Sequence, residues 1–262
     1  MTSKNTTRAT DIDPSDPQSV LRATDWTALE HARGPATDAP EMLIALLDTD
    51  QGIRTKALGY LFNTLHHQNT LYSATVPTAL YVAAILPDPR TTTAVTKTQR
   101  DNPVAMRAEL LNWIDSVADE VTAEAETARR RHGFSLADYP PATEIRDLRP
   151  TLFSAAFAYV HDPDRHIAEA AVQACIPLLD DPQLTHHRQT LVPLVRKALG
   201  TSDHWQHRRQ AINALSTWGE DSSDLEARQN PSPFHDTNAS LNTTPRHADQ
   251  ATKEGYNEDP PF

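Results

Sequence analysis

The sequence predicts an all-α fold, a right-handed α-solenoid of about four helical hairpins. Three segments indicate it, because residues 50–57, 101–108 and 164–171 each begin with Asp, place Ile or Val three positions later, and end with Ala. An acidic residue caps a helix start, and an apolar residue followed by a small one at i+4 forms a close-packed face. A weaker fourth copy spans 203–215. Repeated helix starts of this kind predict hairpins that stack into one extended surface.

Composition indicates one folded domain with two separable ends. The chain has 262 residues, 38% of them hydrophobic, and a net charge of −11. Residues 1–20 and 219–262 carry almost no large apolar side chains, so we expect both to be disordered. The folded body is then 21–218. The C-terminal segment has a net charge of −6 and the body only −4, so the acidity lies mostly in the tail.

The N-terminal part predicts four helices. The first begins at Thr24 or Asp25 and stops at Gly34-Pro35, because glycine ends helices and proline cannot continue them. The second runs from about Pro40 to residue 47, and 48–50 form the turn into its partner. That partner carries an apolar stripe over 53–65. The next hairpin opens at 75–77, where proline suits the first turn, and its first helix ends at 87–89.

The middle of the chain predicts an enlarged repeat around 88–147. A Thr-rich connection leads into an uninterrupted helix from about 103 to 132, and the last turns of this helix lack large apolar residues and should project into solvent. We expect the insertion at 131–147 to be a loop on one face. Two regular hairpins follow, one turning at 161–164 and one at 200–203.

These patterns resemble HEAT repeats, in particular the bacterial HEAT-like proteins grouped with phycobilin-lyase-type repeats. The Asp-x-x-Ile/Val-x-x-x-Ala helix starts and the helix-opening prolines after Val76 and Val192 carry the resemblance. Residues 26–34, 43–50 and 67–75 look like a mostly uncharacterised actinobacterial HEAT-repeat family. The resemblance covers about 24–218 and is strongest over 24–86. It implies a binding scaffold, and some such proteins lie beside toxins as candidate antidotes.

The sequence offers little that is typical of an enzyme. It has no Gly-rich phosphate loop and no Gly-x-Ser-x-Gly elbow, and the consecutive 202–204 Ser-Asp-His residues point in different directions. We therefore expect no catalytic residues, no metal and no cofactor. The single Cys175 lies on an apolar helical face and indicates a reducing compartment. The N-terminus resembles no signal peptide and no stretch resembles a membrane span, so a cytoplasmic protein is expected.

Two groups of residues are candidates for binding a partner. The first is the polar corner at 66–72, where imidazole, amide and phenol groups could form directional hydrogen bonds. The second is the row of second helices, which lines the concave face of a solenoid and carries Trp and Arg side chains. Both have structural alternatives, since histidine near a helix end satisfies free carbonyls and tryptophan is often core. The candidates are His66, His67, Gln68, Tyr72, Arg107, Trp113, Trp205 and Arg208.

Together these observations predict a non-catalytic protein-binding scaffold, in its sharper form an antidote or regulator that sequesters one cytoplasmic protein. The acidic tail either steers a basic partner or keeps the chain in solution. A nucleic-acid-acting HEAT-like protein of the alkyl-purine glycosylase type would need a basic groove, which a body of net charge −4 does not favour. A HEAT-like lyase or metalloenzyme would need converging ligands or a tetrapyrrole-sized pocket. The candidate metal ligands are His204 and His207 on one helix, and His161, Asp162, Asp164 and His166 at the equivalent corner one repeat earlier.

Overall fold

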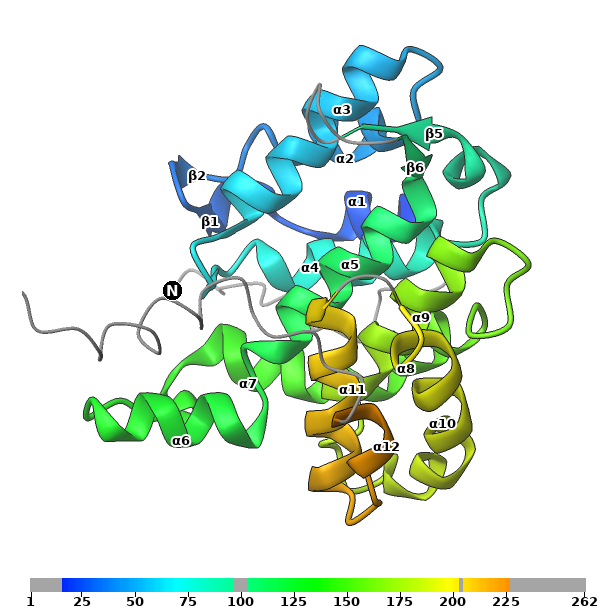
Figure 1. Ribbon diagram of the computed structural model, residues 1–262. Coiled ribbons are helices and arrows are strands. Elements are labelled where there is room, and N and C mark those ends of the chain that lie inside the picture. Colours follow the sequence, from blue (N-terminus) through cyan, green and yellow to red (C-terminus); the bar gives the residue numbers. More distant parts are fainter. Residues whose placement is uncertain (1–15, 97–102, 203–204, 227–262) are drawn as a thin grey trace, which may run out of the picture. The chain divides into compact units, whose positions relative to one another are not determined.

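The computed structural model describes residues 16–96, 103–202 and 205–226, and this part of the chain is mostly helical (Figure 1). Contacts divide the chain after Arg228, and all described residues belong to the unit before it. The described elements are α1 (Pro17–Ala23), a 3₁₀ turn (Trp26–Ala28), β1 (Glu30–His31), β2 (Gly34–Pro35), α2 (Ala39–Ile44), a 3₁₀ turn (Ala45–Leu47), α3 (Gln51–Tyr60), a π turn (Leu61–Leu65), β3 (His66–His67), β4 (Thr70–Leu71), α4 (Thr75–Ile85), a 3₁₀ turn (Pro89–Thr92), β5 (Ala94–Val95), β6 (Val104–Ala105), α5 (Met106–Asp119), α6 (Ala123–Arg131), a 3₁₀ turn (Leu136–Asp138), α7 (Pro140–Asp147), α8 (Arg149–Phe157), α9 (Arg165–Leu178), a 3₁₀ turn (Thr185–His187), α10 (Arg188–Leu194), a π turn (Val195–Leu199), α11 (Trp205–Thr217) and α12 (Ser223–Glu226).

Two of the predicted helix starts are confirmed. Asp50 caps α3, where its Oδ1 accepts from the Ile53 backbone N at 3.0 Å. Asp164 caps α9, where its Oδ1 accepts from the His166 backbone N at 2.8 Å. The small residue of each motif is buried against a neighbour, as a close-packed helix face requires.

The helix start predicted at 101–108 is wrong. Its Asp101 lies outside the described residues, and Val104 and Ala105 form β6 instead of a first helical turn. They pair with β5, so the backbone groups that a helix start would use belong to a β-ladder. The helix α5 begins only at Met106, yet Ala108 is still buried. Asp203 of the weaker fourth copy also lies outside the described residues.

Three short β-hairpins lead the chain into helices, and the sequence did not predict them. The hairpin β1–β2 precedes α2, β3–β4 precedes α4, and β5–β6 precedes α5. The helix expected over 24–34 is wrong, because this segment contains one 3₁₀ turn, capped by Asp25, followed by the β1–β2 hairpin. Gly34 takes a φ of +119° in this hairpin, which glycine adopts readily. A backbone hydrogen bond joins β1 to the start of α4, since the Ala74 N donates to the Glu30 O at 3.1 Å.

The helix expected from 103 to 132 is wrong, because it breaks between α5 and α6. Thr122 starts α6 as its cap, and its Oγ1 accepts from the Ala125 backbone N at 3.2 Å. Arg146 and Arg149 both donate to the Val121 carbonyl, which secures the break. The expected loop over 131–147 contains α7. The helix α6 buries none of its residues, in agreement with the expected solvent-exposed turns.

The most extensive contact between described elements joins α5 and α9. The helix α9 also contacts α8 and the π turn Val195–Leu199, which in turn contacts α11, while α4 contacts α1 and α8. The core consists mainly of aliphatic side chains, and its two largest fully buried side chains are aromatic, Trp113 and Tyr81. Among the described helices, none is long and apolar enough to cross a membrane.

The predicted domain boundaries need adjustment at both ends. The helix α1 lies mostly within 1–20 and buries Val20 completely. The helix α12 lies within 219–262, and Leu225 is buried there. The folded body therefore begins before residue 21 and continues past 218, while 1–15 and 227–262 lie outside the described residues.

Candidate functional site

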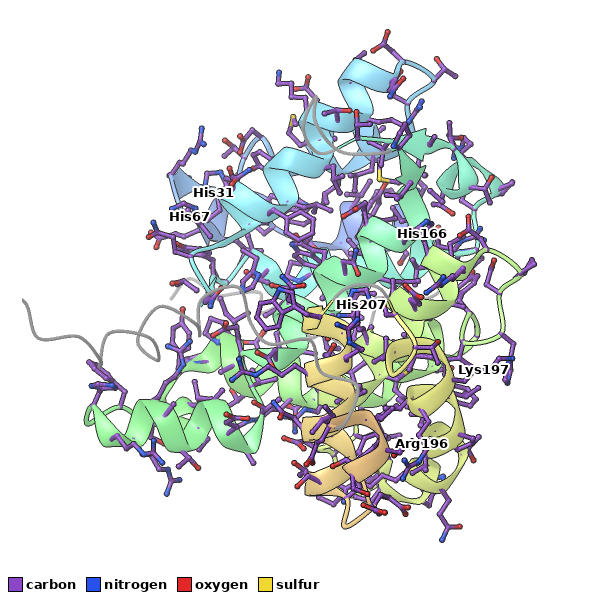
Figure 2. All side chains as sticks on the ribbon, in the orientation of Figure 1. His31, His67, His166, Arg196, Lys197 and His207 are labelled. Carbon is purple, nitrogen blue, oxygen red and sulfur yellow. The ribbon has the colours of Figure 1, made fainter. Side chains whose placement is uncertain are left out.

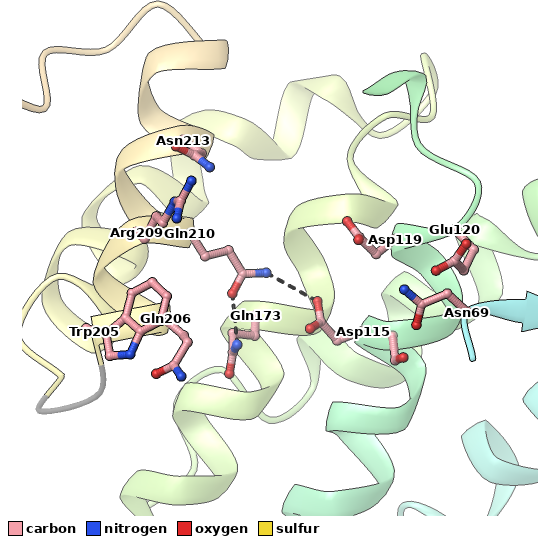
Figure 3. A pocket seen from close by; sticks show the side chains of 11 residues that line it. Asn69, Asp115, Asp119, Glu120, Gln173, Trp205, Gln206, Arg209, Gln210 and Asn213 are labelled. Carbon is pink, nitrogen blue, oxygen red and sulfur yellow. Dashed lines mark hydrogen bonds between the residues drawn. The ribbon is translucent and has the colours of Figure 1, made fainter. Parts of the chain in front are cut away.

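A concave site opens where α5, α9 and α11 come together, next to the tip of the β3–β4 hairpin (Figure 3). We call it the α5–α9–α11 groove. Its volume is about 440 Å³, within the range of about 300–1,000 Å³ found for ligand pockets. Polar side chains provide most of its lining: Asn69, Asp115, Ser116, Asp119, Glu120, Gln173, Gln206, Arg209, Gln210 and Asn213, together with Trp205.

The floor of the groove is a chain of hydrogen bonds across the three helices (Figure 3). Gln173 on α9 donates from Nε2 to Oε1 of Gln210 on α11 at 2.8 Å. Gln210 donates from its own Nε2 to Oδ1 of Asp115 on α5 at 3.3 Å. Each of the three residues comes from a different helix. Their hydrogen bonds to one another fix which of their polar atoms remain available to a ligand. Asp115 and the second amide hydrogens are left with free hydrogen-bonding capacity.

The two walls differ in character. The α11 wall carries Trp205, whose side chain is 45% exposed, and the exposed Arg209 (Figure 3). The opposite wall carries Asp119 and Glu120 at the end of α5, with Asn69 beside them. The backbone of Asn69 takes a left-handed φ of +58°, which a two-residue β-turn of this hairpin requires. An aromatic, cationic wall thus faces an acidic one.

The pKa values of the carboxyl groups in the groove are raised, mainly by burial. Burial raises the pKa of Asp115 to about 7, and the nearby Asp119 charge adds to the effect. Burial also raises the pKa of Asp119, followed by repulsion from Glu124 and Asp180. Asp119 is the last residue of α5, where the helix dipole already places negative charge. Burial raises the pKa of Glu120 as well, but its Oε2 lies 2.6 Å from an Arg129 nitrogen, and this cation opposes the rise. No such cation is paired with Asp115 or Asp119 among the described residues.

The corner predicted at 66–72 forms the β3–β4 hairpin, and only its tip reaches the groove. His66 is buried, its Nδ1 lies 3.1 Å from Oγ of Ser116, and burial lowers its pKa to about 4. His67, which is labelled in Figure 2, is partly buried, and so is Tyr72. Gln68 is exposed beside Asn69, the hairpin residue that lines the groove and that sequence reasoning missed.

Arg107 and Trp113 are interior residues, which corrects their prediction as partner-binding residues. The Arg107 Nε donates to the Leu86 carbonyl at 2.9 Å and to Oγ1 of Thr91 at 3.0 Å. The Trp113 Nε1 donates to the Leu61 carbonyl at 3.1 Å. Both side chains satisfy backbone carbonyls at helix ends, so neither is available to a partner at the surface.

Trp205 alone among the eight candidate residues lines the groove. Arg208 is partly buried and its guanidinium donates to the Ser202 carbonyl, while the adjacent Arg209 faces the groove. The sequence did contain a signal for the acidic wall. Asp115 and Asp119 stand four positions apart on a helix whose other residues are mainly apolar, which places both on one face.

A hydrolytic triad does not fit the neighbouring Ser, His and Glu side chains. Ser202 Oγ lies 2.9 Å from Nδ1 of His207, and Oε2 of Glu169 lies 3.6 Å from the same nitrogen. A triad needs the nucleophile and the carboxylate on opposite ring nitrogens. Figure 2 shows where His207 lies on α11. Within the described ranges no three His, Cys, Asp or Glu side chains are grouped to hold a metal.

Comparison with known proteins leaves the relationship of this chain open. It matches no protein-family model, and no similar protein is found among curated proteins or among solved structures. The resemblance to HEAT repeats therefore remains a hypothesis that rests on the residues themselves.

Proposed function

We propose that this chain is a non-catalytic protein-binding scaffold. In this proposal its helical pairs stack as a short HEAT-like solenoid, and the α5–α9–α11 groove on the second-helix row is where a segment of the partner binds. The observation that carries it is the convergence of three second helices on one open groove, with Trp205 exposed on its wall. Tryptophan in a concave, polar-lined site is typical of the residues that dominate protein interfaces.

The contacts between elements support the stacked arrangement. The pair α4 and α5 contacts the pair α8 and α9, and the latter contacts the π turn that continues α10. Each contact joins elements of successive pairs, which is how repeat proteins build their surfaces. The α5–α9–α11 groove needs this stacking, because its floor takes one residue from each of the three second helices.

The groove is also pre-organised for binding. The hydrogen-bond chain from Gln173 through Gln210 to Asp115 orients the amide groups before a ligand arrives. Binding of a partner then costs the groove side chains less conformational entropy, which favours affinity. The hydroxyl of Ser116, which also lines the groove, is bonded to His66. These features support holding a ligand, and we propose an antidote or regulator that sequesters one protein as the role.

The test is affinity capture of partners from an extract of the native cells. The full chain should retain one stoichiometric protein, and Trp205→Ala should lose it. Phe134→Ala is the matched control, because Phe134 is 70% exposed and does not line the groove. Retention of the same protein by Trp205→Ala would refute the groove as the site. An extract that yields no protein on the unmodified chain would refute the scaffold itself.

A further inference from the structure

We propose that the α5–α9–α11 groove takes an arginine side chain of the partner, with the guanidinium between Asp115 and Asp119 and the aliphatic part against Trp205. This inference rests on the proposed function and specifies the chemistry of the partner. Three observations carry it: the spacing of the two carboxylates, the balance of charge in the groove, and the exposed indole on the opposite wall.

The two carboxylates are placed for a forked donor. Asp115 and Asp119 are four residues apart on α5, so they lie one turn apart on the same face, and both line the groove. Asp115 accepts one hydrogen bond, from Gln210, and keeps further acceptor capacity. A guanidinium is planar and presents several N–H donors in a rigid fork, which suits two acceptors better than an ammonium does.

The charge balance of the groove calls for one more cation. Glu120 is neutralised by Arg129, whose nitrogen lies 2.6 Å from it. When ionised, Asp115 and Asp119 contribute two negative charges, and Arg209 on the opposite wall contributes one positive charge. A single guanidinium therefore brings the groove to neutrality. It also relieves Asp119 of the repulsion from Glu124 and Asp180 at the negative end of α5.

The α11 wall supplies the apolar half of the site. Trp205 lines the groove with nearly half of its side chain exposed. Arginine stacks on indole through its planar guanidinium and the methylene groups that precede it. The amides of Gln206 and Asn213 on the same wall offer both donors and acceptors, so they can bond to the backbone that flanks the arginine.

The experiment uses two capped peptides that differ only in charge. One carries arginine between two glycines, and the other carries citrulline, a neutral isostere of arginine. The full-length chain is labelled with ¹⁵N, and the indole N–H signal of Trp205 is assigned by its loss in Trp205→Phe. Titration with the arginine peptide should shift this signal to saturation. The citrulline peptide should bind at least about tenfold more weakly, as expected when a charge-assisted hydrogen bond becomes a neutral one.

Matched variants separate the groove from the general acidity of the chain. Asp119→Asn should weaken binding of the arginine peptide by about tenfold. Asp138→Asn removes the same charge from an exposed residue that does not line the groove, and it should leave binding unchanged. Thermal unfolding monitored by circular dichroism confirms that both variants are folded. Equal weakening by the two variants would overturn the proposal in favour of non-specific attraction.

The outcomes also separate this inference from the proposed function. If arginine and citrulline peptides bind equally, or if neither binds, the arginine proposal fails. The scaffold proposal then still stands or falls on whether Trp205→Ala loses the captured partner. If the arginine peptide binds but Trp205→Ala keeps the partner, the groove recognises guanidinium and the docking site of that partner lies elsewhere.

Discussion

At the scale of single residues, the buried polar side chains divide into those that hold the fold and those that serve the groove. Arg107 belongs to the first kind. Its guanidinium donates to Leu86 and Thr91, lies 3.8 Å from a carboxylate oxygen of Asp162, and stacks over the ring of Tyr159 with its centre 4.7 Å from the ring centroid. It thereby joins the end of α4 to the turn before α9.

Replacing Arg107 should therefore damage stability. Arg107→Met removes the cation beside the Asp162 carboxylate and one of the two donors to the Leu86 carbonyl, which keeps its bond from Thr91; removing one partner of a buried ion pair costs about 3–5 kcal/mol. Urea unfolding followed by circular dichroism measures this loss. Arg131→Met is the control, because Arg131 is exposed on α6, and it should change stability by less than about 0.5 kcal/mol. Similar stabilities for the two variants would contradict a structural role for Arg107.

The pH dependence of stability should reveal His66. Burial lowers its pKa from 6.5 to about 4, so the unfolded chain takes up a proton first as the pH falls, and acid favours unfolding between about pH 6.5 and 4. Asp115 acts in the opposite direction, because its pKa of about 7 lets the folded state bind a proton in the same window. His66→Phe should gain stability relative to the unmodified chain as the pH falls, approaching roughly 3 kcal/mol near pH 4.

Urea titrations at steps between pH 7 and 4.5 test this balance. Asp115→Asn is the informative counterpart, because it should lose stability on acidification faster than the unmodified chain does. If the free energy of unfolding of His66→Phe runs parallel to that of the unmodified chain, His66 is not the buried group that titrates in this window.

At the scale of elements, α6 is a helix that is held mainly by capping and ion pairs and adds little to the hydrophobic core. It buries no side chain, yet Thr122 caps its start and Gly133, with a φ of +82°, ends it. Glu126 connects it to α7, because one of its oxygens lies 3.1 Å from an Arg146 nitrogen, while the other lies 2.5 Å from a nitrogen of Arg130 on α6 itself. Arg130 is the largest cause that lowers the pKa of Glu126 to about 2.

Glu126→Gln should loosen α6 without unfolding the body. The variant keeps the size of the side chain but removes the charge that attracts Arg130 and Arg146, so amide hydrogen exchange within α6 should accelerate by about tenfold. The midpoint of global unfolding should change little, because α6 has no fully buried residue and packs only the small, partly buried Ala125 against the core. Glu124→Gln on the same helix is the matched control and should leave exchange unchanged. A large fall in the global midpoint would contradict this account of α6 as a locally held element.

Element by element, the sequence predicted what depends on local chemistry. The helices capped by Asp50 and Asp164 were predicted because a cap, an apolar stripe and a small residue all lie within eight positions. The β-hairpins were missed because each strand has only two residues, too few for any alternation of polar and apolar side chains. The break at Val121 was missed because Arg146 and Arg149, which hold it, lie far along the chain.

At the scale of the whole molecule, the groove is a product of tertiary structure. Asp115, Gln173 and Gln210 come from helices far apart in sequence, and nothing in the local pattern of any one helix indicates that they meet. Trp205 could be predicted, because an aromatic residue on the second-helix row is either core or site. Trp113 was a candidate by the same argument, but it is fully buried in the core. Only the position of each helix in the tertiary structure separates the two cases.

The proton on Asp115 links the groove to pH. Its carboxylate is close to Asp119 on the same helix and influences Cys175 on α9, while Gln210 on α11 bonds to it directly. Burial raises the pKa of the Cys175 thiol, so the thiol stays neutral. Among these groups, Asp115 is the one whose ionisation changes near neutral pH.

Binding of the arginine peptide should then strengthen as the pH rises. A guanidinium binds the ionised carboxylate, and with a pKa of about 7 most of Asp115 is protonated at pH 6, so the apparent affinity there should be about tenfold below its value at pH 8. Isothermal titration at pH 6, 7 and 8 measures it. Asp115→Asn should bind weakly with a nearly flat profile, because its amide neither ionises nor attracts the cation. An unchanged profile in that variant would assign the dependence to Asp119, whose pKa burial also raises, and would place the guanidinium nearer the rim of the groove.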